Sequence, residues 1–161
     1  MRRQERQLVV FSLGNEEYGV DILQVQEIKR FSSITRVPNA PAFVEGVINL
    51  RGNVIPVIDL HKRFELGSFV ESEDSRIVIV TVQDLTLGIM VDSVSEVITL
   101  PEEAIAPPPP LVAGIDASFI HGIGKLEDRL LILLNMDRIL GLEEVATAKE
   151  IGAGYVEGAA Q

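Results

Sequence analysis

The sequence predicts a mostly β fold, because strand-length apolar runs recur along it and because it contains an internal repeat. Aliphatic and β-branched runs separated by turn signals occupy residues 8–13, 54–60, 77–82 and 130–134. The run IVIVTV at 77–82 is apolar on both alternating faces, which is typical of a strand covered on two sides, as when two small sheets or barrels pack together. Long helices are not required, and short helical turns are expected where Asn39 and Asp116 can cap them.

The repeat appears when the sequence is shifted against itself. A shift of 69 residues lays FSLGNEEYGVDILQVQEI over VTVQDLTLGIMVDSVSEV, and a shift of 76 lays FVEGVINLRGNVIPVIDL over FIHGIGKLEDRLLILLNM. The two blocks keep the same order in both halves. The shifts match several pairs of residues: Gly19 with Gly88, Val25 with Val94, Glu27 with Glu96, Phe43 with Phe119, and Gly46 with Gly122.

The repeat predicts how the chain of 1–161 is organised as a single domain. Two copies of one β-rich unit are expected at 7–66 and 76–142, joined by a polar segment. The Ala-, Gly- and Glu-rich tail at 143–161 is predicted to be a terminal helix or a frayed end. Gly46 and Gly122 each follow a short apolar turn, so we expect both to adopt a left-handed backbone with positive φ.

Composition and charge exclude several classes of protein. Twenty-four Asp and Glu residues against fourteen Lys and Arg give a formal charge of −10, the wrong sign for a nucleic-acid partner or an anionic lipid surface. The absence of cysteine excludes disulfides, a catalytic thiol and thiolate metal sites. The first apolar run is too short for a signal peptide or a membrane span. A cytoplasmic protein without direct membrane insertion is therefore expected.

The sequence contains no recognisable catalytic, metal or cofactor site. His61 and His121 occupy no metal-ligand spacing, and both are expected to be exposed, His61 as a solvated surface residue beside basic neighbours. The GIGK segment at 122–125 lacks the required positions of a phosphate loop, and no GxSxG elbow is present. The sequence thus predicts a binding module and not an enzyme.

Four segments carry a resemblance to a known family. EEYGVDILQVQEI at 16–28, FVEGVINLRGNVIPVIDL at 43–60, LGIMVDSVSEVITLP at 87–101 and DRLLILLNMDRIL at 128–140 closely resemble the chemotaxis coupling protein family, CheW, over about residues 7–142. The resemblance implies two packed five-stranded SH3-like β-barrels with short helical turns. These would correspond to a first barrel subdomain at 7–66 and a second at 76–142.

The resemblance also implies a function and two partners. A family member is expected to be a non-enzymatic adaptor that joins the cytoplasmic tips of methyl-accepting chemotaxis receptors to the regulatory domain of a CheA-type histidine kinase. Such a protein is cytoplasmic and is recruited to membrane-associated receptor arrays. The alternative is a scaffold for a CheA-like pathway that controls surface motility or gene regulation.

Six positions correspond to functional residues of the family. The receptor-facing surface would include Val25, Glu27, Gly46 and Arg51, and Gly88 and Gly122 match sensitive glycines of the second barrel. Three have structural alternatives, since Val25 can be a core residue, Glu27 a solvated strand charge, and Gly88 a packing position. Arg51 aligns with Glu127 in the repeat, so a buried ion pair common to both halves is not expected, although Arg51 can pair locally with Glu27 or Asp59.

Overall fold

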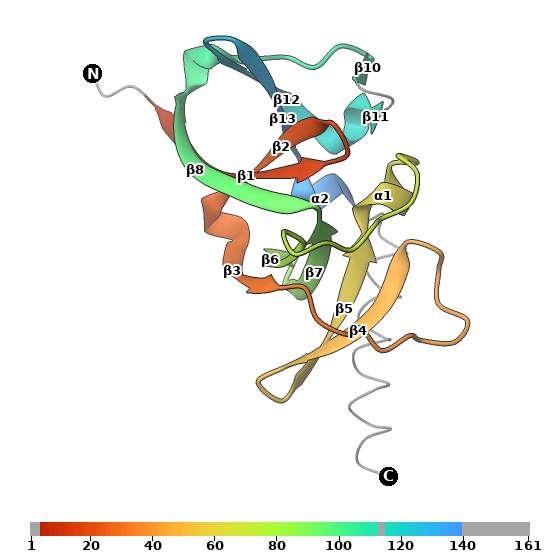
Figure 1. Cartoon of the computed structure of the whole chain (residues 1–161). Coiled ribbons are helices and arrows are strands. Elements are labelled where there is room, and N and C mark those ends of the chain that lie inside the picture. Colours follow the sequence, from red (N-terminus) through yellow and green to blue (C-terminus); the bar gives the residue numbers. More distant parts are fainter. Residues whose placement is uncertain (1–3, 113–114, 140–161) are drawn as a thin grey trace.

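A computed structural model describes residues 4–112 and 115–139 and confirms the mostly β fold (Figure 1). The predicted tail at 143–161 lies outside the described residues. Sheet A has six strands in the order β8 (Ser93–Pro101), β1 (Glu5–Leu13), β2 (Glu16–Asp21), β13 (Arg129–Leu134), β12 (Ile120–Leu126) and β9 (Ile105–Ala106). Sheet B has five strands in the order β3 (Val25–Arg30), β6 (Arg76–Val82), β7 (Leu85–Val91), β5 (Asn53–Asp59) and β4 (Val44–Leu50).

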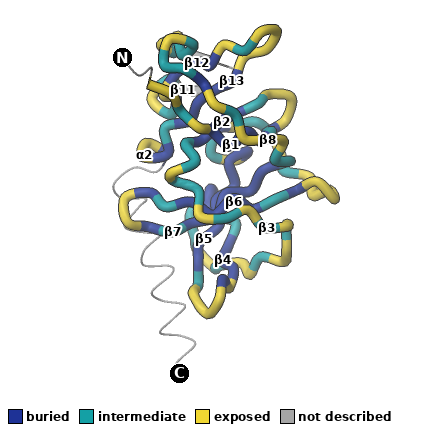
Figure 2. The backbone as a smooth tube through the Cα atoms, turned by 90° about the vertical axis from the view of Figure 1, so that its left-hand side faces the viewer, coloured by how far each residue is buried: buried dark blue, intermediate teal, exposed yellow. Residues whose placement is uncertain are grey.

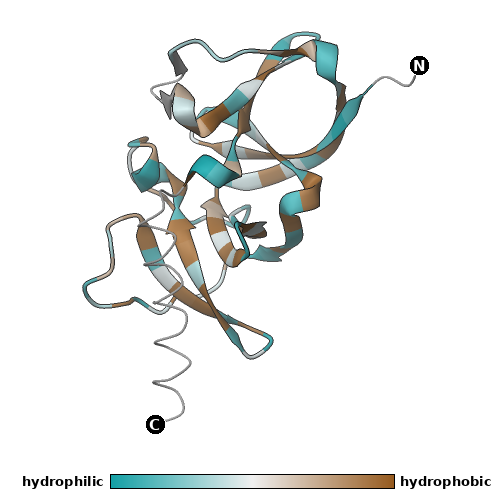
Figure 3. Cartoon of the chain, turned by 180° about the vertical axis from the view of Figure 1, so that it is seen from behind, coloured by the Kyte–Doolittle hydropathy of each residue, from teal (hydrophilic) through white to brown (hydrophobic). Residues whose placement is uncertain are grey.

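The remaining elements are short. The strands β10 (Leu111–Val112) and β11 (Ile115–Asp116) pair with each other. Single helical turns connect the strands: η1 (Ile22–Gln24), α1 (Leu60–Arg63), η2 (Glu102–Ala104), η3 (Ala117–Phe119) and α2 (Met136–Ile139). Asp59 caps α1, because its carboxylate accepts a hydrogen bond from the Lys62 amide at 3.2 Å. In Figure 3 the hydrophobic residues follow the strands and the hydrophilic ones gather at hairpin tips.

Each sheet curls so that its two edge strands are nearly consecutive in the chain. In sheet A, β9 follows β8 after one helical turn and pairs with β12 at the other edge. In sheet B, Thr35 lies just beyond β3 and exchanges two backbone hydrogen bonds with Val47 of β4, at 2.9 and 2.8 Å. We therefore call the two sheets barrel A and barrel B.

The barrels do not follow the sequence division at 7–66 and 76–142, so that part of the prediction is wrong. The hairpin β1–β2 belongs to the first repeat but lies in barrel A, where β1 pairs with β8 and β2 pairs in parallel with β13. The hairpin β6–β7 of the second repeat lies in barrel B, where β6 pairs with β3 and β7 with β5. The repeats have thus exchanged their first hairpins. A repeat reveals equivalent positions, but strand pairing across the chain decides which copy each hairpin joins.

The repeat itself is confirmed by matching strand registers. Gly19 pairs with Leu133 in barrel A, and Gly88 pairs with Val57 in barrel B, which are the positions that the two shifts make equivalent. The irregularities match as well. The break between Val25 and Glu27 in β3 has its counterpart in the register shift where β8 pairs with β1. The two barrels are therefore related by an approximate twofold repeat within one chain.

One shared core joins the barrels. It contains Val9 and Phe11 from β1 of barrel A together with Val78 and Val80 from β6 of barrel B, all at most 1% exposed. Smaller apolar clusters fill the inside of each barrel. Figure 2 shows buried backbone along the central strands and exposed residues at the hairpin tips. The barrels therefore pack as one unit.

His61 contradicts the prediction of a solvated surface histidine, because it is 4% exposed. Its Nε2 lies 3.0 Å from Asp92 Oδ1, and Asp92 Oδ2 accepts a hydrogen bond from the Gly14 amide at 2.6 Å. Asp92 lies where the chain passes from β7 of barrel B to β8 of barrel A, and Gly14 lies in the β1–β2 turn. His61 thus helps to hold the barrels together. His121 is exposed, as predicted.

Candidate partner-binding site

Aliphatic side chains reach the surface where β3 and β8 lie on the same side of the molecule (Figures 1 and 2). Val25 and its repeat partner Val94 are half-buried and pack against the shared core. Ile28 and its repeat partner Val97 are 41% and 52% exposed. We call these four residues the β3–β8 face. Each barrel contributes the same two positions, so the twofold repeat places exposed aliphatic side chains on both barrels beside their shared core.

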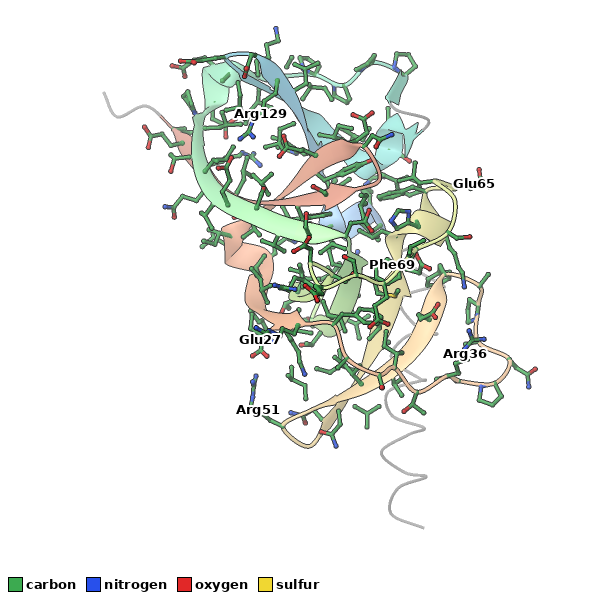
Figure 4. All side chains as sticks on the ribbon, in the orientation of Figure 1. Glu27, Arg36, Arg51, Glu65, Phe69 and Arg129 are labelled. Atoms are coloured by element: carbon green, nitrogen blue, oxygen red, sulfur yellow. The ribbon has the colours of Figure 1, made fainter. Side chains whose placement is uncertain are left out.

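Glu27 and Arg51 flank this face. Arg51 Nη1 donates a hydrogen bond to Glu27 Oε2 at 2.7 Å, and Figure 4 shows Arg51 at the tip of the β4–β5 hairpin below Glu27. Arg51 and Gly52 form the two-residue turn, with φ of 51° and 88°, which matches the twist of the flanking strands. The Arg51 side chain is 68% exposed, so the pair is solvated and able to meet a partner.

The second barrel repeats this pair with a different residue. Glu96, the repeat partner of Glu27, accepts a hydrogen bond from Arg129, whose guanidinium also lies 3.3 Å from Glu17. The hydrogen bond to Glu96 and the nearby carboxylates raise the pKa of Arg129. A Glu–Arg pair is thus common to both halves, but both pairs are exposed, so neither is the buried ion pair that the alignment of Arg51 with Glu127 argues against. Sequence alignment missed it because the arginine moves two residues along the hairpin, from the turn to the start of β13.

Gly46 and Gly122 do not have positive φ, so that prediction is wrong: the described glycines with positive φ are Gly14, Gly52 and Gly67. Glycine is required at both positions because a side chain there would overlap neighbouring atoms. A Cβ on Gly46 would overlap the Thr35 carbonyl and lie 2.7 Å from Ile34 Cγ2, and one on Gly122 would lie 2.8 Å from the Ala106 carbonyl oxygen. Thr35 and Ala106 belong to the segments that close barrels B and A. These glycines therefore let each barrel close.

Gly88 lies inside barrel B and apart from the β3–β8 face. A Cβ there would lie 2.8 Å from Ile77 Cγ2. Of the six predicted site residues, the structure brings Val25, Glu27 and Arg51 together at the surface, whereas Gly46, Gly88 and Gly122 lie at strand contacts. The sequence analysis did not identify the exposed Ile28 and Val97 as site residues. Each directly follows one of the two glutamates that the repeat aligns, Glu27 and Glu96.

A second apolar surface lies at the far end of barrel A. A cavity of about 450 Å³ opens there between the proline run and the β12–β13 hairpin. Leu130, at its edge, is 64% exposed. The lining is mostly apolar, with one carboxylate and one ammonium: Glu16, Ala106, Pro107, Pro109, Ile123, Lys125, Leu130 and Ile132.

Within residues 4–112 and 115–139, no cluster of three or more His, Asp or Glu side chains is placed to hold a metal ion. Within the same ranges, no helix has the length and apolar character needed to cross a membrane.

A family model for the CheW-like domain matches residues 7–144. The chain belongs to the CheW-like domain family. It is 41% identical to the chemotaxis protein CheW of Treponema pallidum over 143 residues, which cover 86% of this chain and 84% of the relative. It is 37% identical to the chemotaxis protein CheW of Klebsiella aerogenes, with 93% and 90% covered. The crystal structure of the scaffolding protein TtCheW from Thermoanaerobacter tengcongensis superposes with a TM-score of 0.81 at 45% identity, covering 89% of this chain and 92% of that one.

The family and these relatives make the CheW-like chain a coupling adaptor of a chemotaxis system. The residues that match the family model include nearly all of the two packed sheets and the exchanged hairpins, so the fold described above is that of the matched domain.

Proposed function

We propose that this CheW-like adaptor joins the cytoplasmic tips of chemoreceptors to the regulatory domain of a CheA-type kinase through two separate surfaces. The observation that carries the proposal is the presence of two exposed apolar surfaces on a pair of barrels that share one core. An adaptor must bind both partners at once, so its surfaces have to be distinct. The protein then acts in the cytoplasm at receptor arrays, without catalysis.

The β3–β8 face is the receptor surface in this proposal. It combines partly exposed aliphatic side chains with the solvated Glu27–Arg51 pair, a combination of apolar centre and polar edge that is typical of protein interfaces. Arg51 carries a planar guanidinium that can exchange its exposed bond to Glu27 for one to a partner carboxylate.

The cavity at the end of barrel A is the kinase surface. Leu130 offers an exposed aliphatic side chain beside a mostly apolar cavity, and exposed prolines form the opposite wall. Contact there would be mainly apolar, and it should survive about 0.3 M salt, at which exposed charges are strongly screened.

Two substitutions test whether the surfaces are separate. Val97→Asp is expected to weaken binding to a receptor-tip fragment about tenfold or more while leaving kinase binding intact, and Leu130→Asp is expected to do the reverse. Val70→Asp is the matched control, because Val70 is 76% exposed and belongs to neither surface. Titration calorimetry with each purified partner makes the measurement. If either variant lost binding to both partners, or if both variants kept binding to both partners, the assignment would be wrong.

The pathway served depends on the receptor. The coupling role is the same in chemotaxis and in a CheA-like pathway for surface motility or gene regulation, so identifying the receptor that copurifies with the chain separates the two.

A further inference from the structure

Two arginines face each other at one end of the β3–β8 face. Arg30 is the last residue of β3 and pairs directly with Arg76, the first residue of β6. Like charges directly opposite each other on adjacent strands destabilise a sheet. The pair is notable in a chain of formal charge −10.

Neither arginine is neutralised within the described residues. Arg76 Nη1 donates to the backbone carbonyls of Glu73 and Ser75, at 2.9 and 2.8 Å, and these bonds carry no compensating negative charge. In residues 4–112 and 115–139, no carboxylate forms an ion pair with Arg30 or Arg76. Arg30 is exposed, so its guanidinium is available to a partner.

The pair shares a surface with the apolar residues. Alternate residues of a strand point to the same side, so Arg30 lies on the side of exposed Ile28. The register continues along β6, where Ile28 pairs with Val78 and Arg30 with Arg76.

The other barrel has no such charge at the equivalent place. The 69-residue repeat makes Thr99 the counterpart of Arg30 and Gln7 the counterpart of Arg76, and these two residues also pair directly, between β8 and β1. The apolar positions of the β3–β8 face are thus nearly symmetric, whereas one end is doubly positive and the other is neutral. A partner segment that contacts only the apolar residues could therefore bind across the face in either direction.

We propose that Arg30 and Arg76 bind carboxylates of an acidic segment that covers the β3–β8 face, and so determine which end of that segment lies over barrel B. The inference rests on the proposed receptor surface and adds the chemistry and direction of the bound segment. Charge complementarity selects this occupant, because two uncompensated guanidinium groups beside exposed aliphatic side chains suit a segment with Asp or Glu next to its apolar stripe.

The test uses the full chain and a receptor-tip fragment from a chemoreceptor of the same genome. The double variant Arg30→Glu, Arg76→Glu is expected to bind the fragment about tenfold more weakly at low salt and to lose most of the salt dependence of the wild-type affinity. The control double variant Lys62→Glu, Arg138→Glu makes the same change in net charge at two exposed residues outside both proposed surfaces and should bind normally. The single variant Arg30→Glu replaces a like-charge pair by an opposite-charge pair, so its melting temperature should not fall.

A swap of charges in the fragment tests direction. Changing the acidic residues at one end of the fragment to Lys should restore binding to Arg30→Glu, Arg76→Glu, while the same change at the other end should not.

The outcomes separate the two proposals. If the wild-type chain does not bind the fragment, the receptor surface is wrong and this inference falls with it. If the wild-type chain binds and the double variant binds equally well, only this inference is overturned. It is also overturned if the double variant instead loses binding to phosphatidylcholine–phosphatidylserine vesicles, or loses self-association in sedimentation, with fragment binding unchanged. Those results would assign the arginines to a membrane or to a second copy.

Discussion

Gly46 has no side chain because the carbonyl of Thr35 passes over it where barrel B closes. We expect Gly46→Ala to destabilise the protein by about 1–3 kcal/mol, since the new methyl group meets backbone that cannot rotate away. Urea unfolding followed by circular dichroism makes the measurement. Gly122→Ala should behave similarly in barrel A.

A paired asparagine substitution separates lack of space from backbone conformation. Gly14 has φ of +62°, and in the described part of the chain no atom would lie within 4 Å of an added Cβ, so Gly14→Asn should be tolerated because asparagine enters the left-handed region readily. Gly46→Asn should be as damaging as Gly46→Ala. If Gly46→Asn were the milder change, space would not be the reason for this glycine.

Arg51 contributes more to binding than to stability. We expect Arg51→Ala to change the free energy of unfolding by only about 0.5 kcal/mol, because its pair with Glu27 is exposed and because arginine and alanine both carry a Cβ and bear similar strain at φ of 51°. Kinase activation in a mixture of receptor, kinase and adaptor should fall clearly. Glu127→Ala is the control and should affect neither. A large drop in melting temperature, or intact coupling, would contradict a role at the partner surface.

Tyr18 makes stability depend on alkaline pH. Burial, with the charge of Glu16 adding to it, raises the pKa of Tyr18 from 10.0 to about 12. A group whose pKa is higher in the folded state holds its proton after the unfolded chain has lost it, so its contribution is fully present below pH 10 and is lost between about pH 10 and 12.

Tyr18→Phe should remove this part of the pH dependence. Among the residues that the structure describes, the buried Tyr18 hydroxyl has no hydrogen-bond partner, so its removal should not lower stability at pH 7. Urea midpoints of both proteins at about pH 8 and 11 make the comparison. An equal loss of stability in both proteins at the higher pH would assign the effect to other groups.

At the scale of elements, the exchanged hairpins decide what each half of the chain can do alone. In residues 1–66, the hairpin β1–β2 lacks both of its neighbours in barrel A, β8 and β13. We therefore expect fragments 1–66 and 76–161 to be unfolded when expressed separately, with partial recovery of β structure on mixing. Near-ultraviolet and far-ultraviolet circular dichroism of each fragment and the mixture test this. A folded 1–66 would support a barrel made within one repeat.

At the scale of the whole molecule, the shared core predicts cooperative unfolding. Phe11 and Tyr18 of barrel A stack with ring centroids 6.0 Å apart, and Tyr18 stacks on Phe64, which follows α1 beside barrel B, at 6.4 Å. Losing either barrel would expose this core, so thermal unfolding should be a single transition by both fluorescence and circular dichroism. Two separated transitions would show that the barrels are independent.

The sequence by itself determined the mostly β class, the strands at the four apolar runs, the twofold repeat and the family. These follow from local patterns: apolar periodicity, turn residues and matched motifs depend on neighbours along the chain. Val25, Glu27 and Arg51 could also be named from the motifs, and the structure brings them to one surface. Only the tertiary structure decided which barrel each hairpin joins and why there is no room for a side chain at Gly46. It alone also showed that His61 is buried against Asp92, and that Arg30 pairs with Arg76 across β3 and β6. Each of these is a contact between segments far apart in the chain, so it depends on which strands pair and how the barrels pack, and not on neighbours along the sequence.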